Sequence, residues 1–340
     1  MNSRAAFSPD MDALRERVAR AIAERVFPGC VIGYIRKDSM PITVAYGSLA
    51  YDNRPVEEST VYDLASVTKS IPTASLALIL EHEGRVSFTD EVKKYIPELQ
   101  NDFGATIEDL LRYKVRGPRM SQFALHTFEE IRTHILEHGF DGPPGKSQYT
   151  NLPAYLLGVI VERIGGGGLP ALAHKYFFDP LGMDQTTYFP TASDCAPTEI
   201  TPDGETIRGL VHDESSLPFA LSRRAVGHAG LFSTAKDMLE FLEALINGRY
   251  PAIVVGAQSG LGWVVQEERL MGTHVGEKAF GKSGFTGTSM VVDIEKRAAL
   301  VILSNRTYPK RPDDAISLTS AINLLRRDIA DIVFSYDADT

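Results

Sequence analysis

The chain has 340 residues, of which 44% are hydrophobic and 23% charged, and its formal net charge is -9 at pH 7. This composition is ordinary for a globular protein and supplies enough apolar material for a large core or two adjoining lobes. The acidic balance and the lack of a long Lys/Arg run argue against nucleic acid or an anionic membrane surface as a partner.

The N-terminal sequence shows neither the apolar core region nor the cleavage site of a signal peptide. No stretch approaches the roughly 20 apolar residues that a membrane span needs. We therefore expect a cytoplasmic protein, and a leader outside this sequence would change that expectation. The two cysteines, Cys30 and Cys195, are too few for a disulfide framework, and a single disulfide between them stays open.

The hydrophobic periodicity predicts strands near both ends of the chain and helices between them. In chain order, a helix starts near Ser8-Pro9-Asp10, strands follow at 29–35 and 42–45, and a mostly apolar, buried helix spans 66–83. Helices are expected at 106–113, 127–137, 152–164, 169–177 and 235–246. Strands follow at 262–266, 278–282, 289–294 and 298–304, and a last helix covers about 314–335. The expected fold is α/β (α+β), with one sheet assembled from the two termini and an all-helical insertion.

The first motif with chemical meaning is Ser66-Val67-Thr68-Lys69, at the start of the expected buried helix. A serine hydroxyl needs a neighbouring base or charge before it becomes a good nucleophile. A spacing of i, i+3 puts Lys69 on the same helix face as Ser66. The alternative is that Ser66 caps the helix and Lys69 is exposed to solvent.

The second motif is Tyr149-Thr150-Asn151, just before a helix with Pro153 in its first turn. Both Tyr149 and Asn151 can project into a cleft there. A tyrosine beside lysines can act as a general base, because the cations stabilise its phenolate. The alternative is that Asn151 caps the helix and Tyr149 packs against it.

The third motif is Lys282-Ser283-Gly284 on a late strand. A cation at a strand edge can hold a substrate carboxylate, and glycine allows a substrate to approach the backbone closely. The alternative is an edge-strand lysine before a glycine-rich hairpin.

S-x-x-K, Y-x-N and K-S-G in this order resemble the serine β-lactamase and penicillin-binding protein superfamily, in particular its class C-like branch with D-alanyl peptidases and esterases. The resemblance covers about residues 12–335. It implies a β-lactamase/transpeptidase-like fold with an antiparallel sheet flanked by helices. We expect residues 1–65 and 255–340 to form the sheet lobe, residues 66–254 to form a mostly helical lobe, and the active site to lie in the cleft between them.

The resemblance also implies roles for individual residues. Ser66 would be the nucleophile, with Lys69 and Tyr149 as its proton-transfer partners, and which of these two is the main general base stays open. The substrate would be bound by Asn151, which orients the acyl side chain, and by Lys282, Ser283 and Gly284. The backbone N–H groups of Ser66 and Phe285 would form the oxyanion hole.

Three features depart from the family pattern. Asp109-Leu110-Leu111 is followed by Arg112-Tyr113-Lys114 where the family has a His-Thr-Ser-Gly turn, which weakens inference about the substrate. Pro72 should kink the nucleophile helix. Lys282 stands where many esterase-like members have His or Trp, which favours a carboxylate on the substrate.

Several other signals carry less weight. The string His134-Ile-Leu-Glu137-His138 has the H-x-x-E-H order of some zinc proteases, but no third ligand is evident and a solvated helix face explains it better. His212-Asp213-Glu214 could form a metal or hydrogen-bonding site, but a solvated loop is the favoured interpretation. The glycine-flanked His228 could line the cleft, but a structural role is favoured. No G-x-S-x-G or G-x-G-x-x-G string is present, so an α/β-hydrolase and a dinucleotide enzyme are disfavoured.

The sequence therefore predicts a serine hydrolase that forms an acyl-enzyme on Ser66, with no metal and no cofactor. Its partner would be a small molecule with an ester, amide or lactam carbonyl: a β-lactam, a D-amino-acid peptide or a carboxylic ester. The alternatives are a carboxylesterase or acyltransferase of the same fold without β-lactam activity, and a catalytically idle binding or assembly relative.

Overall fold

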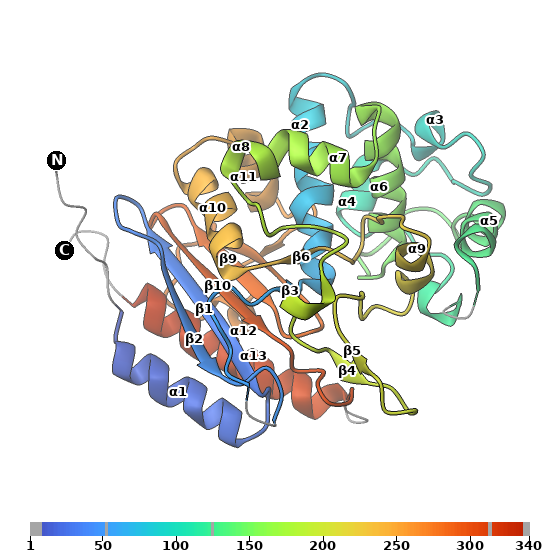
Figure 1. Cartoon of the computed structure of the whole chain (residues 1–340). Coiled ribbons are helices and arrows are strands. Elements are labelled where there is room, and N and C mark those ends of the chain that lie inside the picture. The colour runs from blue at the N-terminus through green and yellow to red at the C-terminus, as the bar shows by residue number, and fades with distance from the viewer. Residues whose placement is uncertain (1–8, 52–53, 124–125, 312–314, 336–340) are drawn as a thin grey trace.

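The computed structural model describes residues 9–51, 54–123, 126–311 and 315–335, with the side chains of the last helix described from residue 320. Six strands form one antiparallel sheet in the order β2-β1-β10-β9-β8-β7 (Figure 1). Strands from both ends of the chain thus lie side by side, which confirms the predicted sheet. The strands are β1 (Gly29–Arg36), β2 (Ile42–Gly47), β7 (Val264–Val265), β8 (Phe280–Ser283), β9 (Ser289–Asp293) and β10 (Ala298–Ser304).

The longest strand pair in the sheet is formed by β1 and β10, in which Cys30 lies opposite Ser304 and Arg36 opposite Ala298. All seven residues of β10 are buried, as the continuous apolar run predicts for a strand covered on both faces. Because side chains alternate along a strand, Val301 and Leu303 point to one hydrophobic core and Leu300 and Ile302 to the other.

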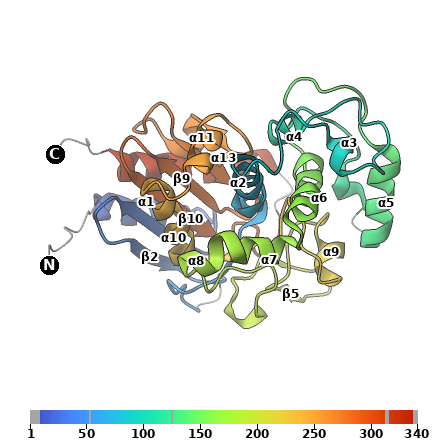
Figure 2. The same ribbon diagram turned by 90° about the horizontal axis from the view of Figure 1, so that it is seen from above.

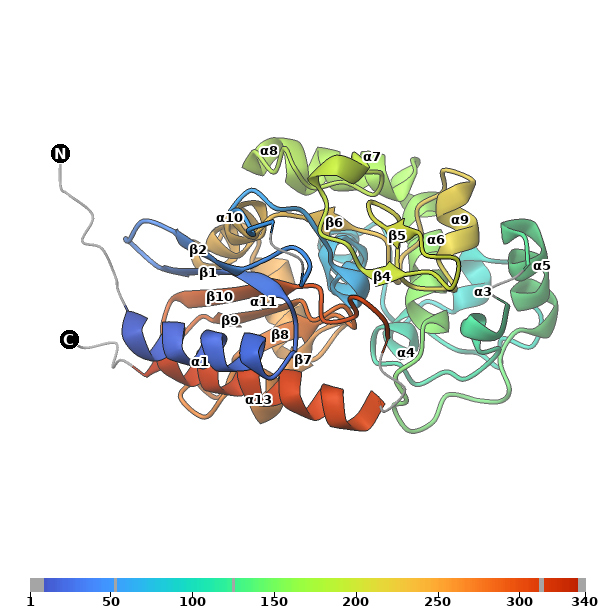
Figure 3. The same ribbon diagram turned by 60° about the horizontal axis from the view of Figure 1, so that its bottom comes forward.

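Helices from distant parts of the sequence cover the two faces of the sheet. One face packs against α1 (Met11–Ala23) and α13 (Ala315–Phe334), which lie side by side (Figure 3), with α12 (Glu268–Met271) beside α13. The Asp10 side chain caps α1 by accepting the N–H groups of Asp12 and Ala13, whereas Ser8, also part of the predicted start, lies outside the described residues. The other face packs against α10 (Ala235–Ile246), with α11 (Pro251–Gln258) against β7 and β8.

The remaining helices gather beside the sheet (Figure 2). They are α2 (Ser75–His82), α3 (Val92–Tyr95), α4 (Ile107–Leu111), α5 (Phe128–His138), α6 (Leu152–Gly165), α7 (Leu169–Ala173), α8 (Asp179–Leu181) and α9 (Leu217–Leu221), with the short strand pairs β3 (Tyr62–Asp63)/β6 (Phe232–Ser233) and β4 (Glu199–Ile200)/β5 (Thr206–Ile207). One hydrophobic core runs from the α10 face of the sheet into these helices. The predicted 66–254 lobe therefore includes one helix, α10, that packs on the sheet.

The predicted continuous helix at 66–83 is wrong in its first half. Residues Ala65–Lys69 form a 3-10 helix, η1, residues Ser70–Ala74 form a π-type turn, η2, and only Ser75–His82 is α-helical. The break lies at Ile71, whose φ of -118° and ψ of 114° are extended. Pro72 explains this break, because a proline lacks the N–H for a helical hydrogen bond and pushes the preceding residue out of the helical region. The predicted kink at Pro72 is confirmed.

The structure also answers two questions from the sequence, on a disulfide and on a membrane span. Cys30 and Cys195 are buried free thiols, so no disulfide joins them. Within the described residues no single helix is long and apolar enough to cross a membrane; only the bent pair Leu152–Gly165 and Leu169–Leu181 meets the length and composition criteria when taken together.

Candidate active site

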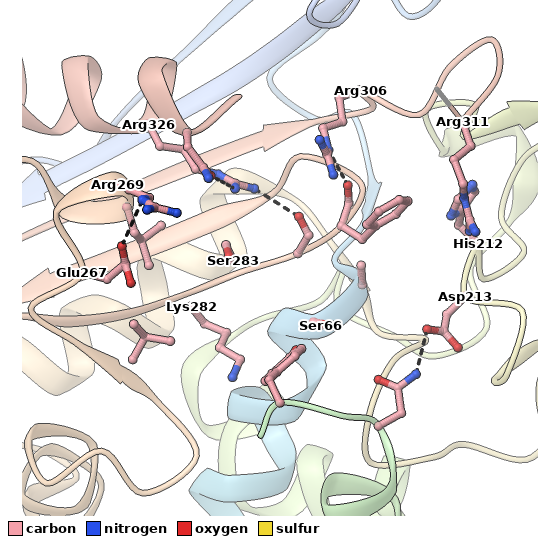
Figure 4. A pocket seen from close by; sticks show the side chains of 18 of the residues that line it. Ser66, His212, Asp213, Glu267, Arg269, Lys282, Ser283, Arg306, Arg311 and Arg326 are labelled. Atoms are coloured by element: carbon pink, nitrogen blue, oxygen red, sulfur yellow. Dashed lines mark hydrogen bonds and ion pairs between the residues drawn. The ribbon is translucent and has the colours of Figure 1, made fainter. Parts of the chain in front are cut away.

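Residues from both parts of the molecule line a cleft of about 650 Å³ (Figure 4). It contains most of the residues that the three motifs singled out: Ser66 from η1, Tyr149 and Asn151 from the loop before α6, and Lys282, Ser283, Gly284 and Phe285 from the end of β8. Ser66 and Tyr149 are 83 residues apart in sequence, and Tyr149 and Lys282 are 133 residues apart, yet all three meet in one place.

Ser66 and Lys69 are in direct contact. The Lys69 Nζ donates hydrogen bonds to the Ser66 Oγ at 2.8 Å and to the His228 carbonyl at 2.8 Å. The 3-10 conformation of η1 favours this contact, because residues i and i+3 of a 3-10 helix lie directly above one another. Lys69 is only 1% exposed, so the alternative of a solvent-exposed lysine is wrong.

The backbone that carries the serine is held in an unusual conformation. Ala65 has a φ of 47°, in the left-handed region that residues with a Cβ rarely adopt. Its N–H donates to the Asp63 Oδ1 at 2.8 Å, and Asp63 is buried and also accepts the His212 N–H at 2.7 Å. Such strain persists where the surroundings fix the backbone, as this carboxylate does here.

Tyr149 lies with its hydroxyl against Ser66 and Lys69, while 54% of the residue is exposed toward the cleft. Enclosure of the hydroxyl opposes ionisation, but the charges of Lys69 and Lys282 and hydrogen bonds to Ser66 and Lys69 outweigh it, so the pKa of Tyr149 is lowered. The ring centre is 5.2 Å from the Lys69 Nζ and 5.0 Å from the Lys282 Nζ. A phenol in these surroundings can exchange a proton with Ser66.

Asn151 makes no capping hydrogen bond to α6, so the capping alternative is wrong. Its Nδ2 instead donates to the Asp213 Oδ2 at 3.2 Å and to the Ser215 Oγ at 3.1 Å. The sequence placed Asp213 in a polar loop without assigning it a role.

Lys282 is 2% exposed and donates to the Tyr113 hydroxyl at 3.3 Å and to the Gly262 carbonyl at 3.5 Å. Its pKa is lowered to about 8, mainly by burial and also by repulsion from Lys69, against the opposing effect of Tyr149. β7 pairs only with Phe280 and Gly281, so the strand edge beyond it is open at Lys282 and Ser283. This agrees with the prediction of a lysine at a strand edge.

The hairpin after Lys282 is fastened to η1. The hydroxyl of Thr286 donates to the Asp63 carbonyl at 2.7 Å, and that of Thr288 donates to the Leu64 carbonyl at 3.0 Å. Arg326 of α13 is buried and donates to the carbonyls of Gly284 and Thr288 at 3.1 and 2.8 Å. These contacts bring the backbone around Phe285 close to that of Ser66, as a shared oxyanion hole requires. Its assignment to these two N–H groups stays a prediction.

Gly284 is the position where this approach is tightest. A Cβ there would lie 2.4 Å from the Leu64 carbonyl oxygen and 2.3 Å from the Thr288 Oγ1. Gly284→Ala is therefore expected to reduce the free energy of unfolding by about 1–3 kcal/mol and to lower kcat by moving the hairpin away from Ser66. Chemical denaturation and turnover measurements check this. Gly142→Ala is the matched control, because a Cβ at Gly142 would meet no atom within 4 Å; an equal loss in both variants would contradict the steric explanation.

A buried polar network lies behind Lys69. His228 is completely buried, and its Nε2 lies 3.0 Å from the Ser215 Oγ and 2.8 Å from the Ser216 Oγ. Burial lowers the pKa of His228, and repulsion from Lys69 adds to this against the opposing effect of Asp213. The network holds the His228 carbonyl in place as the second acceptor of Lys69.

The histidine-containing strings that resemble metal sites in the sequence make ordinary polar contacts in the structure. The rings of His134 and His138 on α5 are stacked, with their centres 5.9 Å apart. The His138 Nε2 lies 2.9 Å from the Asp141 Oδ1. His212 lines the cleft, but its Nε2 contacts Glu199 at 2.9 Å. Within the described ranges no group of three or more His, Cys, Asp or Glu side chains could hold a metal ion.

Sequence reasoning assigned no role to several residues in or beside the cleft, among them Tyr113, Asp213 and Arg326. Tyr113 lies in the segment that departs from the family pattern, and Asp213 lies in a polar triplet, so each had a weak signal. Arg326 interrupts the apolar side of the last helix between Ile322 and Ile329, which are both fully buried. A charged residue within such an apolar stripe could have been identified as a functional candidate from the sequence, because buried charges need specific partners.

Comparisons with known proteins show the family and the fold of this chain. The family model described as Beta-lactamase matches residues 14–322. A putative D-alanyl-D-alanine carboxypeptidase of Escherichia coli strain K12 is 30% identical over 315 residues, which cover 75% of this chain and 71% of that protein. The octameric penicillin-binding protein homologue from Pyrococcus abyssi superimposes with a TM-score of 0.74 at 20% identity, covering 97% of this chain and 79% of the other. EstCE1, a hydrolase with promiscuous acyltransferase activity, has a TM-score of 0.73 at 18% identity, covering 93% and 98%.

Proposed function

This chain belongs to the β-lactamase family, and from that premise we propose that it is a serine hydrolase acylated on Ser66 by a small substrate with a carboxylate on its leaving group. The observation that carries the proposal is the 2.8 Å contact between the Lys69 Nζ and the Ser66 Oγ, in a cleft that also holds the buried cation Lys282. A serine and a base at hydrogen-bond distance are the minimal apparatus for nucleophilic catalysis.

The proposed reaction has two steps. The Ser66 Oγ attacks the substrate carbonyl carbon while its proton passes to Tyr149 or Lys69, and the oxyanion is held by the N–H groups of Ser66 and Phe285. The bond from the carbonyl carbon to the leaving nitrogen or oxygen then breaks, and the leaving group takes up the proton. In the second step a water molecule adds to the acyl carbonyl carbon and the bond from that carbon to the Ser66 Oγ breaks. Ser66 takes up a proton from the water, and the free acid is released.

The charges at one end of the cleft support a carboxylate on the leaving group. In Figure 4, Lys282 and Arg326 lie on the opposite side of Ser66 from Asp213. Since Asn151 contacts Asp213, the acyl part belongs on that side and the leaving group on the side of Lys282 and Ser283. The carboxypeptidase name of the Escherichia coli relative fits such a substrate. A carboxypeptidase releases the C-terminal residue of a peptide, so the leaving group is an amino acid that carries the free carboxylate.

The carboxylate proposal has a pH signature. Lys282 is protonated below its pKa of about 8 and loses its charge above it. For a carboxylate-bearing substrate compared with its neutral amide, the ratio of kcat/KM values is expected to fall with rising pH, by roughly twofold near pH 8 and up to roughly tenfold one pH unit higher. Steady-state kinetics on both substrates measures this ratio. Lys282→Arg keeps the charge and should flatten the profile, whereas a flat profile in the unmodified enzyme would contradict the proposal.

Covalent labelling tests the proposed acylation. The protein would be incubated with a fluorophosphonate and with a fluorescent penicillin, and each adduct located by mass spectrometry of peptides. A fluorophosphonate adduct on Ser66 supports the serine hydrolase, and a penicillin adduct supports a carboxylate-bearing substrate. Labelling by the fluorophosphonate alone would favour the esterase alternative. EstCE1, which has a similar fold, is a hydrolase with promiscuous acyltransferase activity. The absence of both adducts would favour an idle binding relative.

Two other features stay predictions from the sequence. Cell fractionation would test the cytoplasmic location. Turnover of β-lactams, D-peptides and p-nitrophenyl esters, measured side by side, would rank the three substrate classes.

A further inference from the structure

Asp213 is the feature of the cleft that the proposed chemistry does not use. It lies in the loop between β5 and α9, lines the cleft, and its side chain is 23% exposed. Burial opposes its ionisation, but its interactions with His228, Lys69 and Ser215 outweigh burial, so the pKa of Asp213 is lowered and the side chain is a carboxylate. A carboxylate this far buried normally has a cationic partner.

No cation among the described residues takes that place. His228 lies 3.7 Å from the Asp213 Oδ1, but burial lowers the pKa of His228 and favours the neutral imidazole. Arg311 interacts with the charge of Asp213, but its guanidinium is paired with Glu214 at 3.0 Å. Lys69 also faces Asp213 and is bound to Ser66 and to the His228 carbonyl.

The hydrogen bonds of Asp213 leave one oxygen available to a ligand. Oδ1 accepts from the Ser215 N–H at 3.0 Å, the Ser215 hydroxyl at 2.5 Å and the Ser216 N–H at 3.0 Å. Within the part of the chain that the structure describes, Oδ2 accepts only from the Asn151 Nδ2, at 3.2 Å. A carboxylate oxygen has two lone pairs, so Oδ2 can accept a further hydrogen bond from the cleft.

The same contacts decide which group of the Asn151 carboxamide is available to a substrate. Both N–H groups of its carboxamide are used, one by Asp213 and the other by Ser215. The group that Asn151 can offer a substrate is therefore its oxygen, a hydrogen-bond acceptor. On the other side of the acyl position, the Phe285 carbonyl already accepts from the Arg306 Nε at 2.6 Å. The Asn151 oxygen and the Phe285 carbonyl are thus both hydrogen-bond acceptors, and each can still accept a bond from a donor on the substrate.

We propose that Asp213 and the Asn151 carboxamide oxygen bind a protonated amino group on the acyl part of the substrate. The substrates of this enzyme are then aminoacyl amides or esters with a free amino group. This inference deepens the proposed function and rests on it. A charge-assisted hydrogen bond from the ammonium group to Asp213 would complete the missing ion pair.

The test compares substrates that differ only in this group. Alanine p-nitroanilide and isobutyric p-nitroanilide have nearly the same shape, with an ammonium group in one and a methyl group in the other, and neither leaving group carries a carboxylate. Their kcat/KM values, each divided by the rate of uncatalysed hydrolysis, give a preference ratio for the D- and for the L-alanine compound. We expect a ratio of at least about 10 at pH 7 for one enantiomer. N-acetylalanine p-nitroanilide should be the poorest substrate.

The pH dependence of this ratio adds a second readout. Titration of Lys282, on the leaving-group side of the cleft, changes the rates of both substrates and cancels in the ratio. The charged groups that face Asp213 itself are Lys69, His228, Asp63 and Arg311. The ratio should therefore decline as the substrate amino group loses its proton, near the ordinary α-amino pKa of about 8. A ratio that stays constant through this range would overturn the proposal.

Variants assign the effect to Asp213. Asp213→Asn should bring the preference ratio close to one, and Glu214→Gln, which removes the same charge from the neighbouring residue, should preserve it. An equal fall in both variants would overturn the assignment to Asp213. If Asp213→Asn does not fold, the ratio of the unmodified enzyme still decides, since a value of one or less contradicts the proposal. Fluorophosphonate labelling of Ser66 in the same preparation separates this outcome from a failure of the proposed acylation.

Discussion

Ser66→Ala is expected to lower kcat by about 10⁴-fold or more on any substrate that the enzyme turns over. The substitution removes the only atom in the proposed mechanism that forms a bond to the substrate. It leaves the contacts that hold the cleft, because Ala65 and Asp63 on one side and Lys69 and His228 on the other do not depend on the Ser66 hydroxyl. Turnover of p-nitrophenyl esters and covalent labelling by a fluorophosphonate measure the loss.

Ser283→Ala is the control for this prediction. Ser283 is a second serine at the cleft, on β8, and the mechanism assigns it no covalent role. Its variant should keep the fluorophosphonate adduct on Ser66. An adduct that persists in Ser66→Ala and is lost in Ser283→Ala would show that the nucleophile is misassigned.

Lys69→Met is expected to lower kcat/KM by about 10²–10⁴-fold, the usual contribution of a positioned acid or base. Lys69 either takes the proton of Ser66 itself or stabilises the Tyr149 phenolate by its charge, and the variant loses both effects. The protein should still fold, because methionine fills a similar volume and replacing a buried charge by an apolar side chain often costs little stability. Stopped-flow acylation rates and thermal denaturation together check this; a variant that keeps its acylation rate would exclude Lys69 from proton transfer.

Tyr149→Phe distinguishes the two candidate bases. A phenolate base is active above the pKa of Tyr149, which the cations lower, so activity of the unmodified enzyme should rise with pH through that pKa. In Tyr149→Phe this rise should disappear. If the rise persists while the rate falls only slightly, Lys69 is the main base and Tyr149 orients it.

Much of the fold could be predicted because its signals are local. The continuous apolar run of β10 and the amphipathic pattern of α13 identify a buried strand and a covering helix wherever they occur. The break at Ile71 was predicted as a kink from Pro72 alone. The sequence did not predict that the residues before the break form a 3-10 helix, because that conformation depends on how Asp63 and the hairpin at Gly284 hold the backbone.

By itself the sequence determined the members of the three motifs and their order, since Ser66-x-x-Lys69, Tyr149-x-Asn151 and Lys282-Ser283-Gly284 are short strings of specific chemistry. Only the tertiary structure decided which unmarked residues join them. Asp213 and Arg326 line the cleft from a loop before α9 and from the buried side of α13, and Tyr113, in the loop after α4, contacts Lys282. No local pattern encodes such contacts, because a side chain's partners across a cleft depend on how distant segments pack, and that packing determines the charge that each substrate group meets.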